Sequence, residues 1–312
     1  MKKVFEFLNS LMTAAGDEWQ LAIRKKGTET LIDGNGDGFL LIPSSTRYWY
    51  ADPFLFSYRG QTYVFVEMYD RTQRKGVIGF ATLNGTHCSK FQVCLETPYH
   101  LSYPCVFTHN NEIYMVPESY QSGEISIYKS TNFPYSWEKV SVLCGEVGVD
   151  TTPIQTESDT IFLSTFFESK TRRANNNLYL ILADGTKKIL YSNNYRVRSA
   201  GHILYHHGNQ IRPAQDCEKT YGEQIIFYQI DVLNSNRLEE HEIMSVAAPD
   251  SNTPAKTVIR IEKRNKKRKF IGTHTYNSDN NYEIIDLKYR DGKSSIYFAQ
   301  NLWSYILSKF RK

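Results

Sequence analysis

Carboxylates and histidines recur at similar points of several short segments. Each segment has an apolar stretch, a turn signal and a second apolar stretch, and polar residues stand at their outer ends. Asp52, Tyr103, Asp150 and His202 begin the first stretches, whereas Glu67, Glu118, Asp216 and His274 end the second ones. Carboxylates gathered at one site suit sugar chemistry, in which one group acts as base or nucleophile and another as acid.

The candidate catalytic groups are Asp52, Glu118 and Asp150. Asp52 would be the base that deprotonates an acceptor hydroxyl. A structural role is the alternative for each of them, because Asp before Pro often starts a strand and a Glu at a strand end can cap backbone amides.

The candidate substrate-binding residues are cationic, polar or aromatic. Arg212, His202 and His274 would hold the negative charge of a donor phosphate. Tyr48, Trp49 and Tyr103 would stack on sugar rings. The complete set is Arg47, Trp49, Tyr103, His202, Arg212, Asp216 and His274.

The segments repeat about every 50 residues, with anchors at Pro53, Pro104, Pro153 and Ile203, and Thr253-Pro254 continues the series. Each unit reads as four strands, which predicts an all-β, five-bladed β-propeller forming a single domain over 1–312. The expected blades are about 48–100, 101–148, 149–198, 199–250 and 251–300, and Phe270–His274 is the expected second strand of the last. A β-sandwich with chance spacing is the alternative.

The two ends of the chain receive separate predictions. The lead segment Trp19–Ile23 would close the ring on the last blade, and residues 301–312 read as a short amphipathic C-terminal helix. In a blade, the innermost strand and its neighbour run antiparallel. The starts of innermost strands and the ends of second strands therefore share one face, where we expect the candidate site residues to meet.

The amino-acid composition excludes some classes of protein. Apolar residues make up 41% and the net charge is +4, so the chain is globular and lacks the basic stripe of a nucleic-acid-binding protein. Five cysteines without a CxxC pair indicate reduced thiols. Glu6 and Asn9 interrupt the apolar N-terminal stretch. We therefore expect a cytoplasmic protein whose basic C-terminal tail contacts the inner membrane peripherally.

Neither a metal site nor a cofactor is expected. His206-His207-Gly208-Asn209 reads as a hairpin turn, because no nearby acid completes a ligand set. The stretch from Asp33 to Gly38 mimics a calcium loop, but Ser44 stands where such a loop requires Glu.

Several motifs together resemble a known family. They are Arg47-Tyr48-Trp49-Tyr50-Ala51-Asp52-Pro53-Phe54, Phe65-Val66-Glu67, Lys75-Gly76-Val77-Ile78, Ser102-Tyr103-Pro104, Pro117-Glu118-Ser119, Arg212-Pro213-Ala214-Gln215-Asp216-Cys217, Tyr221-Gly222 and Gly272-Thr273-His274-Thr275-Tyr276-Asn277. The stretch from about residue 19 to 290 resembles the N-terminal domain of plant glucosamine inositolphosphorylceramide transferases, a domain that also occurs in bacterial proteins linked to surface polysaccharide synthesis.

A wider resemblance is to the five-bladed arabinanase and β-xylosidase glycosidases. It implies that Asp52, in Ala51-Asp52-Pro53, is a general base and that Asp150 tunes a pKa. Those enzymes place an acidic Glu at the start of the fourth blade, where this chain has Gly201-His202-Ile203. Glu118 is the substitute acid that the second blade offers.

Three functions remain open from the sequence. The first is a glycosyltransferase that takes a sugar donor and a glycan acceptor in bacterial surface polysaccharide or glycolipid biosynthesis. The second is an arabinanase-like glycoside hydrolase. The third is a non-catalytic glycan-binding propeller. We expect the first, because a phosphate leaving group needs cations rather than a strong acid.

Overall fold

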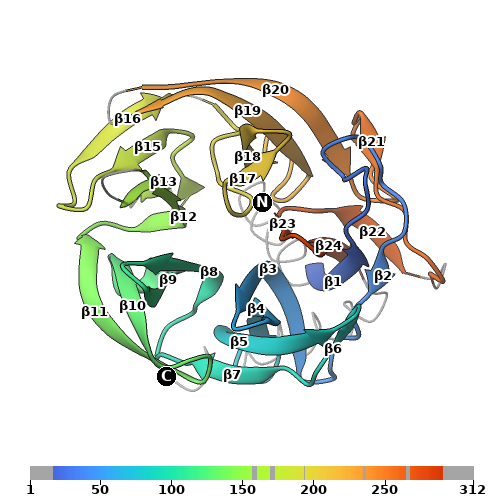
Figure 1. The fold of residues 1–312 in the computed structure, drawn as a ribbon, viewed down its shortest axis with the longest axis horizontal. Helices are drawn as coiled ribbons and strands as arrows, with labels where there is room; N and C mark the ends of the chain where they lie inside the picture. Colours follow the sequence, from blue (N-terminus) through green and yellow to red (C-terminus); the bar gives the residue numbers. More distant parts are fainter. Residues whose placement is uncertain are drawn as a thin grey trace, which may run out of the picture.

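Alternating apolar and polar residues fold the chain into strands, and the strands form five sheets around a common axis (Figure 1). The computed structural model describes residues 17–156, 160–168, 173–192, 194–234, 237–264 and 268–290. Within those ranges the one helical element is a turn of 3-10 helix, Tyr120–Ser122. The five-bladed β-propeller is therefore confirmed.

Three blades use consecutive segments of the chain. The first contains β3 (Tyr48–Tyr58), β4 (Gln61–Asp70), β5 (Lys75–Asn84), β6 (His87–Cys88) and β7 (Gln92–Leu95). The second contains β8 (Ser102–His109), β9 (Glu112–Glu118), β10 (Ile125–Asn132) and β11 (Ser136–Cys144). The third contains β12 (Gly148–Gln155), β13 (Thr160–Glu168), β14 (Arg173–Ala174), β15 (Leu178–Ile181) and β16 (Lys187–Tyr191).

The other two blades depart from the simple repeat. The fourth contains β17 (Leu204–His206), β18 (Asn209–Asp216), β19 (Gln224–Asn234), β20 (Arg237–Ala247) and β21 (Thr257–Val258). The fifth contains β22 (Lys269–Gly272), β23 (Tyr276–Ser278), β24 (Tyr282–Arg290), β1 (Asp17–Lys25) and β2 (Leu40–Leu41).

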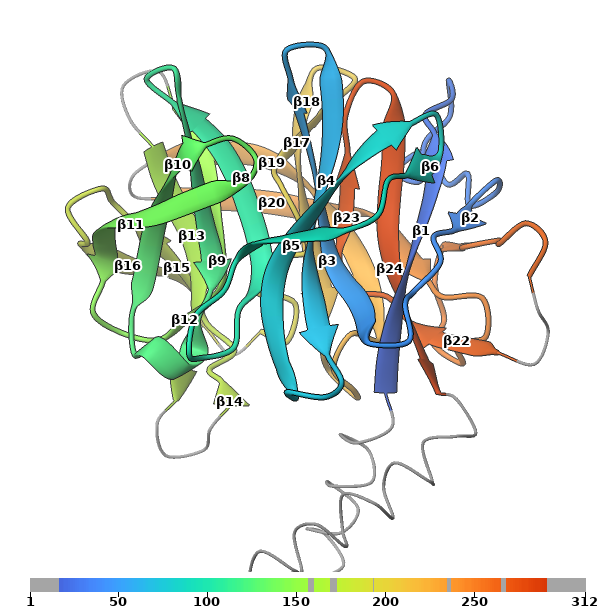
Figure 2. The same ribbon diagram turned by 90° about the horizontal axis from the view of Figure 1, so that it is seen from below.

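The start of the chain closes the ring, as the sequence predicted. Strand β1 pairs antiparallel with β24 over its whole length, from Asp17↔Arg290 to Lys25↔Tyr282. Figure 2 shows β1 and β24 side by side between the first blade and β22.

The predicted start of the fifth blade near residue 253 is wrong. Thr257–Val258 pairs with β20 in the fourth blade instead. The innermost strand of the fifth blade is β22 followed by β23, so Phe270–His274 belongs to the first strand rather than the second. Strands β22, β23 and β24 supply the inner half of this blade, and β1 and β2 supply its outer half.

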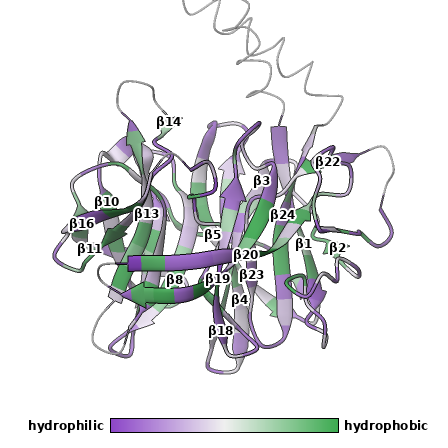
Figure 3. Ribbon diagram, turned by 90° about the horizontal axis from the view of Figure 1, so that it is seen from above, coloured by the Kyte–Doolittle hydropathy of each residue, from purple (hydrophilic) through white to green (hydrophobic). Residues whose placement is uncertain are grey.

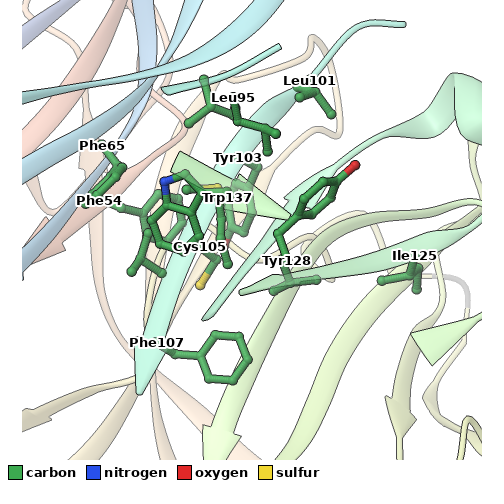
Figure 4. Packing of buried hydrophobic residues seen from close by; sticks show 14 of the residues in the cluster. Phe54, Phe65, Leu95, Leu101, Tyr103, Cys105, Phe107, Ile125, Tyr128 and Trp137 are labelled. Carbon is green, nitrogen blue, oxygen red and sulfur yellow. The ribbon is translucent and has the colours of Figure 1, made fainter. Parts of the chain in front are cut away.

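Aromatic and aliphatic side chains seal the joints between blades. Figure 4 shows Phe54 and Phe65 of the first blade packed with Tyr103 and Trp137 of the second. Along the strands, apolar segments alternate with hydrophilic ones, and the outer strand β20 is largely hydrophilic (Figure 3). Burial of this apolar surface fixes the blades relative to one another.

A β-bulge interrupts the innermost strand of each of the first three blades. Asp52, Tyr103 and Asp150 occupy these bulges with φ of 49°, 47° and 50°, and the strand register shifts at each of them. Left-handed backbone is costly for residues other than glycine and is most often retained at functional sites. These bulges therefore mark the face that gathers Asp52 and Asp150.

Two earlier expectations concern membranes and cysteines. In the part of the chain that the structure describes, no helix is long and apolar enough to span a bilayer. The predicted C-terminal helix over 301–312 lies outside the described residues, so the membrane contact stays a prediction. All five cysteines are free thiols.

Candidate active site

Asp52 is the centre of a buried hydrogen-bond network. Its Oδ1 accepts from the Thr275 hydroxyl at 2.9 Å and lies 3.3 Å from His274 Nε2, and its Oδ2 accepts from the Tyr103 backbone N–H at 3.1 Å. Its own backbone N–H donates to Asp286 at 3.1 Å. Groups from the first, second and fifth blades thus fix this carboxylate.

The His274 ring bridges two carboxylates. Its Nδ1 lies 2.7 Å from Asp286 Oδ2, and Asp286 Oδ1 accepts the backbone N–H groups of His274 and Thr275. Trp19 stacks on the ring, with centroids 3.9 Å apart. Burial alone would lower the pKa of His274, but Asp286 and Asp52 outweigh it and raise that pKa above its usual value. The two carboxylates that the ring bridges therefore favour its protonated form.

A second ion-paired group joins the third and fourth blades. Arg198 Nε donates to Asp150 Oδ2 at 2.5 Å, and Arg198 Nη2 lies 3.7 Å from Glu118 Oε2. Gln215 adds a hydrogen bond to the same Asp150 oxygen at 2.9 Å. The Asp150 backbone N–H donates to Glu118 Oε2 at 3.3 Å, so Arg198, Asp150 and Glu118 are linked in one network.

The pKa values of two carboxyls of this face are shifted upward. Burial, with the negative charges of Asp286 and Asp150, raises the pKa of Asp52 to about 6, although His274 opposes the shift. Burial and the charge of Asp150 raise the pKa of Glu118 well above its usual value, despite Arg198. Separated pKa values of neighbouring carboxyls are typical of acid and base pairs.

Glu67 extends the acidic cluster. It stands opposite Ala51 in the first blade just as Glu118 stands opposite Ser102 in the second. Burial and the nearby carboxylates raise its pKa well above the usual range. Its Oε1 lies 3.3 Å from His100 Nε2, while His100 Nδ1 accepts the Gly76 N–H. His100 is neutral, because burial lowers its pKa to about 4.

Aromatic rings surround the acidic groups. Trp49 stacks on Tyr69 with centroids 4.5 Å apart, and Tyr120 stacks on Phe167 at 6.0 Å. The Tyr221 ring, 46% exposed, receives Arg198 on its face and meets His274 edge-on. Partly exposed ring faces beside carboxyls are suited to contact with sugars.

The structure brings together four of the predicted residues, Asp52, Glu118, Asp150 and His274, and places Trp49 in the aromatic surround. Tyr103 is in the channel, but it is fully buried. Its hydroxyl bonds Thr152 at 2.8 Å and the Gly201 N–H at 2.9 Å, so it offers no surface for stacking.

Four other predicted residues lie away from this cluster. Arg212 is buried in the fourth blade, where Glu240 binds both Nε (2.7 Å) and Nη2 (2.5 Å), so it does not reach a donor phosphate at this face. Asp216 pairs with Arg196 at 3.0 Å, and Arg47 pairs with Asp70 at 2.6 Å. These three residues were predicted at the site from their positions in the strand pattern alone. Their side chains instead bind neighbours within or beside their own sheets.

His202 faces the opposite end of the channel. Its ring meets Phe54 edge-on at 4.9 Å and its Nδ1 lies 3.5 Å from Cys105 Sγ. It lines a cavity of about 400 Å³ with Gln155, the last residue of β12, and Asp279, which follows β23. The bulge of the fourth blade spans more residues than the others, which carries His202 past the acidic face.

Gly201 explains why the fourth blade supplies no acid. Its φ is +137°, and a Cβ there would lie 2.0 Å from the Tyr276 carbonyl oxygen. The position can therefore hold no side chain. At the entrance to this blade stands Arg198, a cation that binds Asp150, in place of the carboxylic acid that the glycosidase resemblance would require.

Sequence reasoning missed Arg198, Asp286, Gln215, Tyr221 and Trp19 as members of the site. Asp286 was missed because the fifth blade was counted from residue 253. Had Thr273 and His274 been aligned with Asp52-Pro53, the facing residue on the next strand would have been found. Arg198 lies before the anchor chosen for the fourth blade, and its pairing with Asp150 spans 48 positions that no local signal connects.

A metal ion is not needed to explain the Asp52, His274 and Asp286 group. Their ligand atoms lie within 4.8 Å of one another. Those atoms already face one another as anion, cation and anion, and Asp286 Oδ1 accepts two backbone N–H groups. The three side chains and these backbone groups already satisfy one another.

Comparison with known proteins decides the family. Residues 42–260 match the family model described as "Glucosamine inositolphosphorylceramide transferase 1, N-terminal". The chain belongs to this family. Curated relatives include glucosamine inositolphosphorylceramide transferase 1 of Arabidopsis thaliana, 30% identical over 205 residues, and that of Oryza sativa subsp. japonica, 30% identical over 211 residues. These alignments cover 62% and 61% of this chain but only 27% of each relative.

Solved structures share the fold. One is a GH43 β-xylosidase/α-arabinofuranosidase from a compost microbial metagenome, with a TM-score of 0.55, 9% identity and coverage of 80% of this chain and 88% of that one. Another is the catalytic domain of a Coprinopsis cinerea GH62 α-L-arabinofuranosidase, with a TM-score of 0.53, 12% identity and coverage of 88% and 98%. At this identity the likeness is one of fold.

Proposed function

We propose that the acidic face catalyses transfer of a glycosyl group from a sugar donor to a hydroxyl of a glycan or glycolipid acceptor. The observation that carries this proposal is the pair of buried carboxyls, Asp52 and Glu118, whose pKa values are raised by burial and by neighbouring carboxylates. Membership of a family named for a transferase supports transfer over hydrolysis.

Asp52 serves as the base. With a pKa of about 6 it is largely ionised at neutral pH, yet basic enough to take a proton from an attacking hydroxyl. Thr275, Tyr103 and His274 hold it in one orientation from three sides. Such prior positioning lowers the entropy cost of the reaction.

Glu118 serves as the acid. Its Oε2 accepts the Asp150 backbone N–H, so the proton of its neutral form belongs on Oε1. This proton can pass to the departing oxygen of a glycoside. An O-linked glycan donor needs such an acid, whereas a sugar phosphate does not.

The donor is therefore a glycoside rather than a sugar phosphate. The cations of the face are already paired, Arg198 with Asp150 and His274 with Asp286 and Asp52. Arg212, expected to bind a donor phosphate, is held by Glu240 instead. A bacterial surface polysaccharide or glycolipid supplies the acceptor in this proposal, and the cytoplasmic location stays a prediction.

The test uses the full chain with a panel of aryl glycosides that carry either good or poor leaving groups, and mass spectrometry separates transfer products from free sugar. Glu118→Gln should lose activity with poor leaving groups but retain it with dinitrophenyl glycosides, which need no acid. Asp52→Asn should lose turnover by about 10²-fold or more with both. Glu112→Gln, an exposed Glu of the same strand β9, is the control and should behave as wild type.

Unchanged kinetics in Glu118→Gln would refute the acid assignment. Accumulation of free sugar alone, in the presence of acceptor sugars, would show a hydrolase instead.

A non-catalytic glycan-binding propeller is the second candidate, and the stacked Trp49 and Tyr69 rings favour it. In that case wild type would bind glycans without turnover. Trp49→Ala would then weaken binding more than Asp52→Asn.

A further inference from the structure

Three potential metal ligands from two distant parts of the chain meet at the edge between the fourth and fifth blades. His206 Nε2 lies 2.8 Å from Asp33 Oδ1, and His207 Nε2 lies 3.2 Å from the same oxygen. Asp33 precedes the histidines by more than 170 positions, which is why the sequence showed no acid beside them. The ligand atoms of all three lie within 4.8 Å of one another.

We propose that Asp33, His206 and His207 form a binding site for a divalent late first-row transition metal ion, with Zn²⁺ as the first candidate. Two imidazole nitrogens and one carboxylate oxygen are ligands that Zn²⁺ accepts, at about 2.0–2.2 Å each. Ligand atoms already 2.8 and 3.2 Å apart need only small side-chain rotations to surround one ion.

The carboxylate is positioned in advance. Asp33 Oδ2 accepts both the backbone N–H and the hydroxyl of Thr30, each at 2.8 Å, which leaves Oδ1 directed at the imidazoles. The loop itself is anchored, because Glu283 accepts the Leu31 N–H at 2.9 Å. Outer hydrogen bonds of this kind orient metal ligands in proteins.

The histidines are fixed by a tight turn. His206 pairs with Asn209 at the end of β17, and His207 and Gly208 form the turn with φ of 48° and 83°. Both central residues in left-handed backbone define a type I′ hairpin. The rings are 4.0 Å apart, and both present a nitrogen to the same Asp33 oxygen.

The site is open to solvent. The His207 side chain is 70% exposed, whereas those of His206 and Asp33 are 13% and 22% exposed. A metal ion can therefore enter, and water completes its coordination. When bound, the ion links the loop between β1 and β2 to the β17–β18 hairpin, which joins the closing blade to its neighbour.

The test measures Zn²⁺ binding by calorimetry with tag-free, chelator-treated full-length protein. Wild type should bind one equivalent. His207→Asn keeps the turn, since Asn tolerates left-handed backbone, and should weaken binding at least about tenfold, the scale seen even for outer-shell partners. His241→Asn is the matched control, because His241 forms a single pair with Asp231 at 2.8 Å.

A second readout is thermal. Zn²⁺ at a concentration that saturates wild type should raise the melting temperature of wild type by about 3 °C and that of His207→Asn by clearly less. The variants should melt like wild type without metal, which shows that they fold. Unchanged Zn²⁺ affinity in a His206→Gln/His207→Asn double variant, or no binding by wild type at millimolar Zn²⁺, would overturn the site.

The metal site and the glycosyl-transfer site can fail separately. The β17–β18 turn lies at the far ends of the innermost strands, whereas the acidic face lies at their starts. His207→Asn should therefore leave any glycosyl-transfer rate as in wild type.

Discussion

Asp52 is the residue whose ionisation should govern the pH dependence of turnover. Its pKa is raised from 3.8 to about 6 by burial and by Asp286 and Asp150. As the base it must be ionised, so the rate should rise as pH increases through about 6 and fall at higher pH when Glu118 loses its proton. A pH profile of kcat/KM checks this, and a flat acidic limb would contradict it.

The raised pKa of Asp52 should also make the free energy of unfolding depend on pH. Because the folded-state pKa of Asp52 exceeds its unfolded value, the folded protein binds more protons between pH 3.8 and about 6. The corresponding stability is present below that window and is lost as pH rises through it. His274, whose pKa is also raised, acts in the same direction. Urea unfolding across the window should show a smaller loss in Asp52→Asn than in wild type.

We expect Arg212 to be needed for stability and Arg198 to be needed for turnover. Arg212→Leu leaves the buried Glu240 carboxylate unpaired, so the free energy of unfolding should fall by about 3–5 kcal/mol, while the kinetics of the folded fraction stay unchanged. Arg198→Leu should reduce turnover, because Arg198 orients Asp150 and Glu118. Urea titration together with kinetics checks both. A selective kinetic loss in Arg212→Leu would restore the phosphate-binding role first expected for it.

Site residues were predictable from the sequence where they occupy equivalent positions in different blades. Asp52 and Asp150 stand at matching points of the first and third blades, and Glu118 matches Glu67 one blade earlier, so the repeat pointed to all three. Arg198 and Asp286 were beyond reach, because their roles depend on contacts between blades rather than on position within one. Arg212 was misjudged because a strand pattern does not reveal that Glu240, 28 positions later, lies beside it.

At the scale of elements, the turn at Tyr221-Gly222 holds the Trp19 and His274 stack. Gly222 has φ +64°, and a Cβ there would lie 2.6 Å from Trp19 and 3.2 Å from His274. Gly222→Ala should cost about 1–2 kcal/mol for the backbone and about 1–3 more for overpacking, and should also reduce turnover.

Gly85→Ala is the matched control for this turn. Its φ is +59° and nothing lies within 4 Å of the added Cβ, so only the backbone cost remains. Urea titration of both variants compares them. Equal destabilisation of Gly222→Ala and Gly85→Ala would mean that the Trp19 and His274 rings move aside without an energetic cost.

Strand prediction succeeded in the first four blades and for the closing segment Trp19–Ile23, but it failed for the inner strands of the fifth blade. The first four blades follow the alternation and turn signals of the sequence. In the fifth blade, the innermost strand is interrupted at Thr273–Thr275. It also begins later in the sequence than the spacing predicts, because a long connection containing β21 precedes it. A regular spacing of about 50 residues could not anticipate that connection.

For the whole molecule, Glu283 fastens the closing blade. It is fully buried, pairs with Arg24 at 2.7 Å and accepts hydrogen bonds from the Leu31 N–H and the Tyr276 hydroxyl. Glu283→Gln leaves Arg24 without its counter-charge, so the free energy of unfolding should fall by about 3–5 kcal/mol. Glu112→Gln, at the exposed Lys129 pair, should cost less than about 1 kcal/mol. Similar losses in urea titrations of the two variants would argue against this anchor.

Pairing of β1 with β24 also sets an order of events during synthesis. Strand β1 finds its partner β24 only when the segment around Tyr282 to Arg290 has left the ribosome. Until then its edge is unpaired, and an exposed apolar edge invites contact with other chains. Contacts this distant in sequence form slowly. Chaperone demand and aggregation should therefore peak late in translation, and a permuted chain that begins at β3 and joins β24 directly to β1 should escape both.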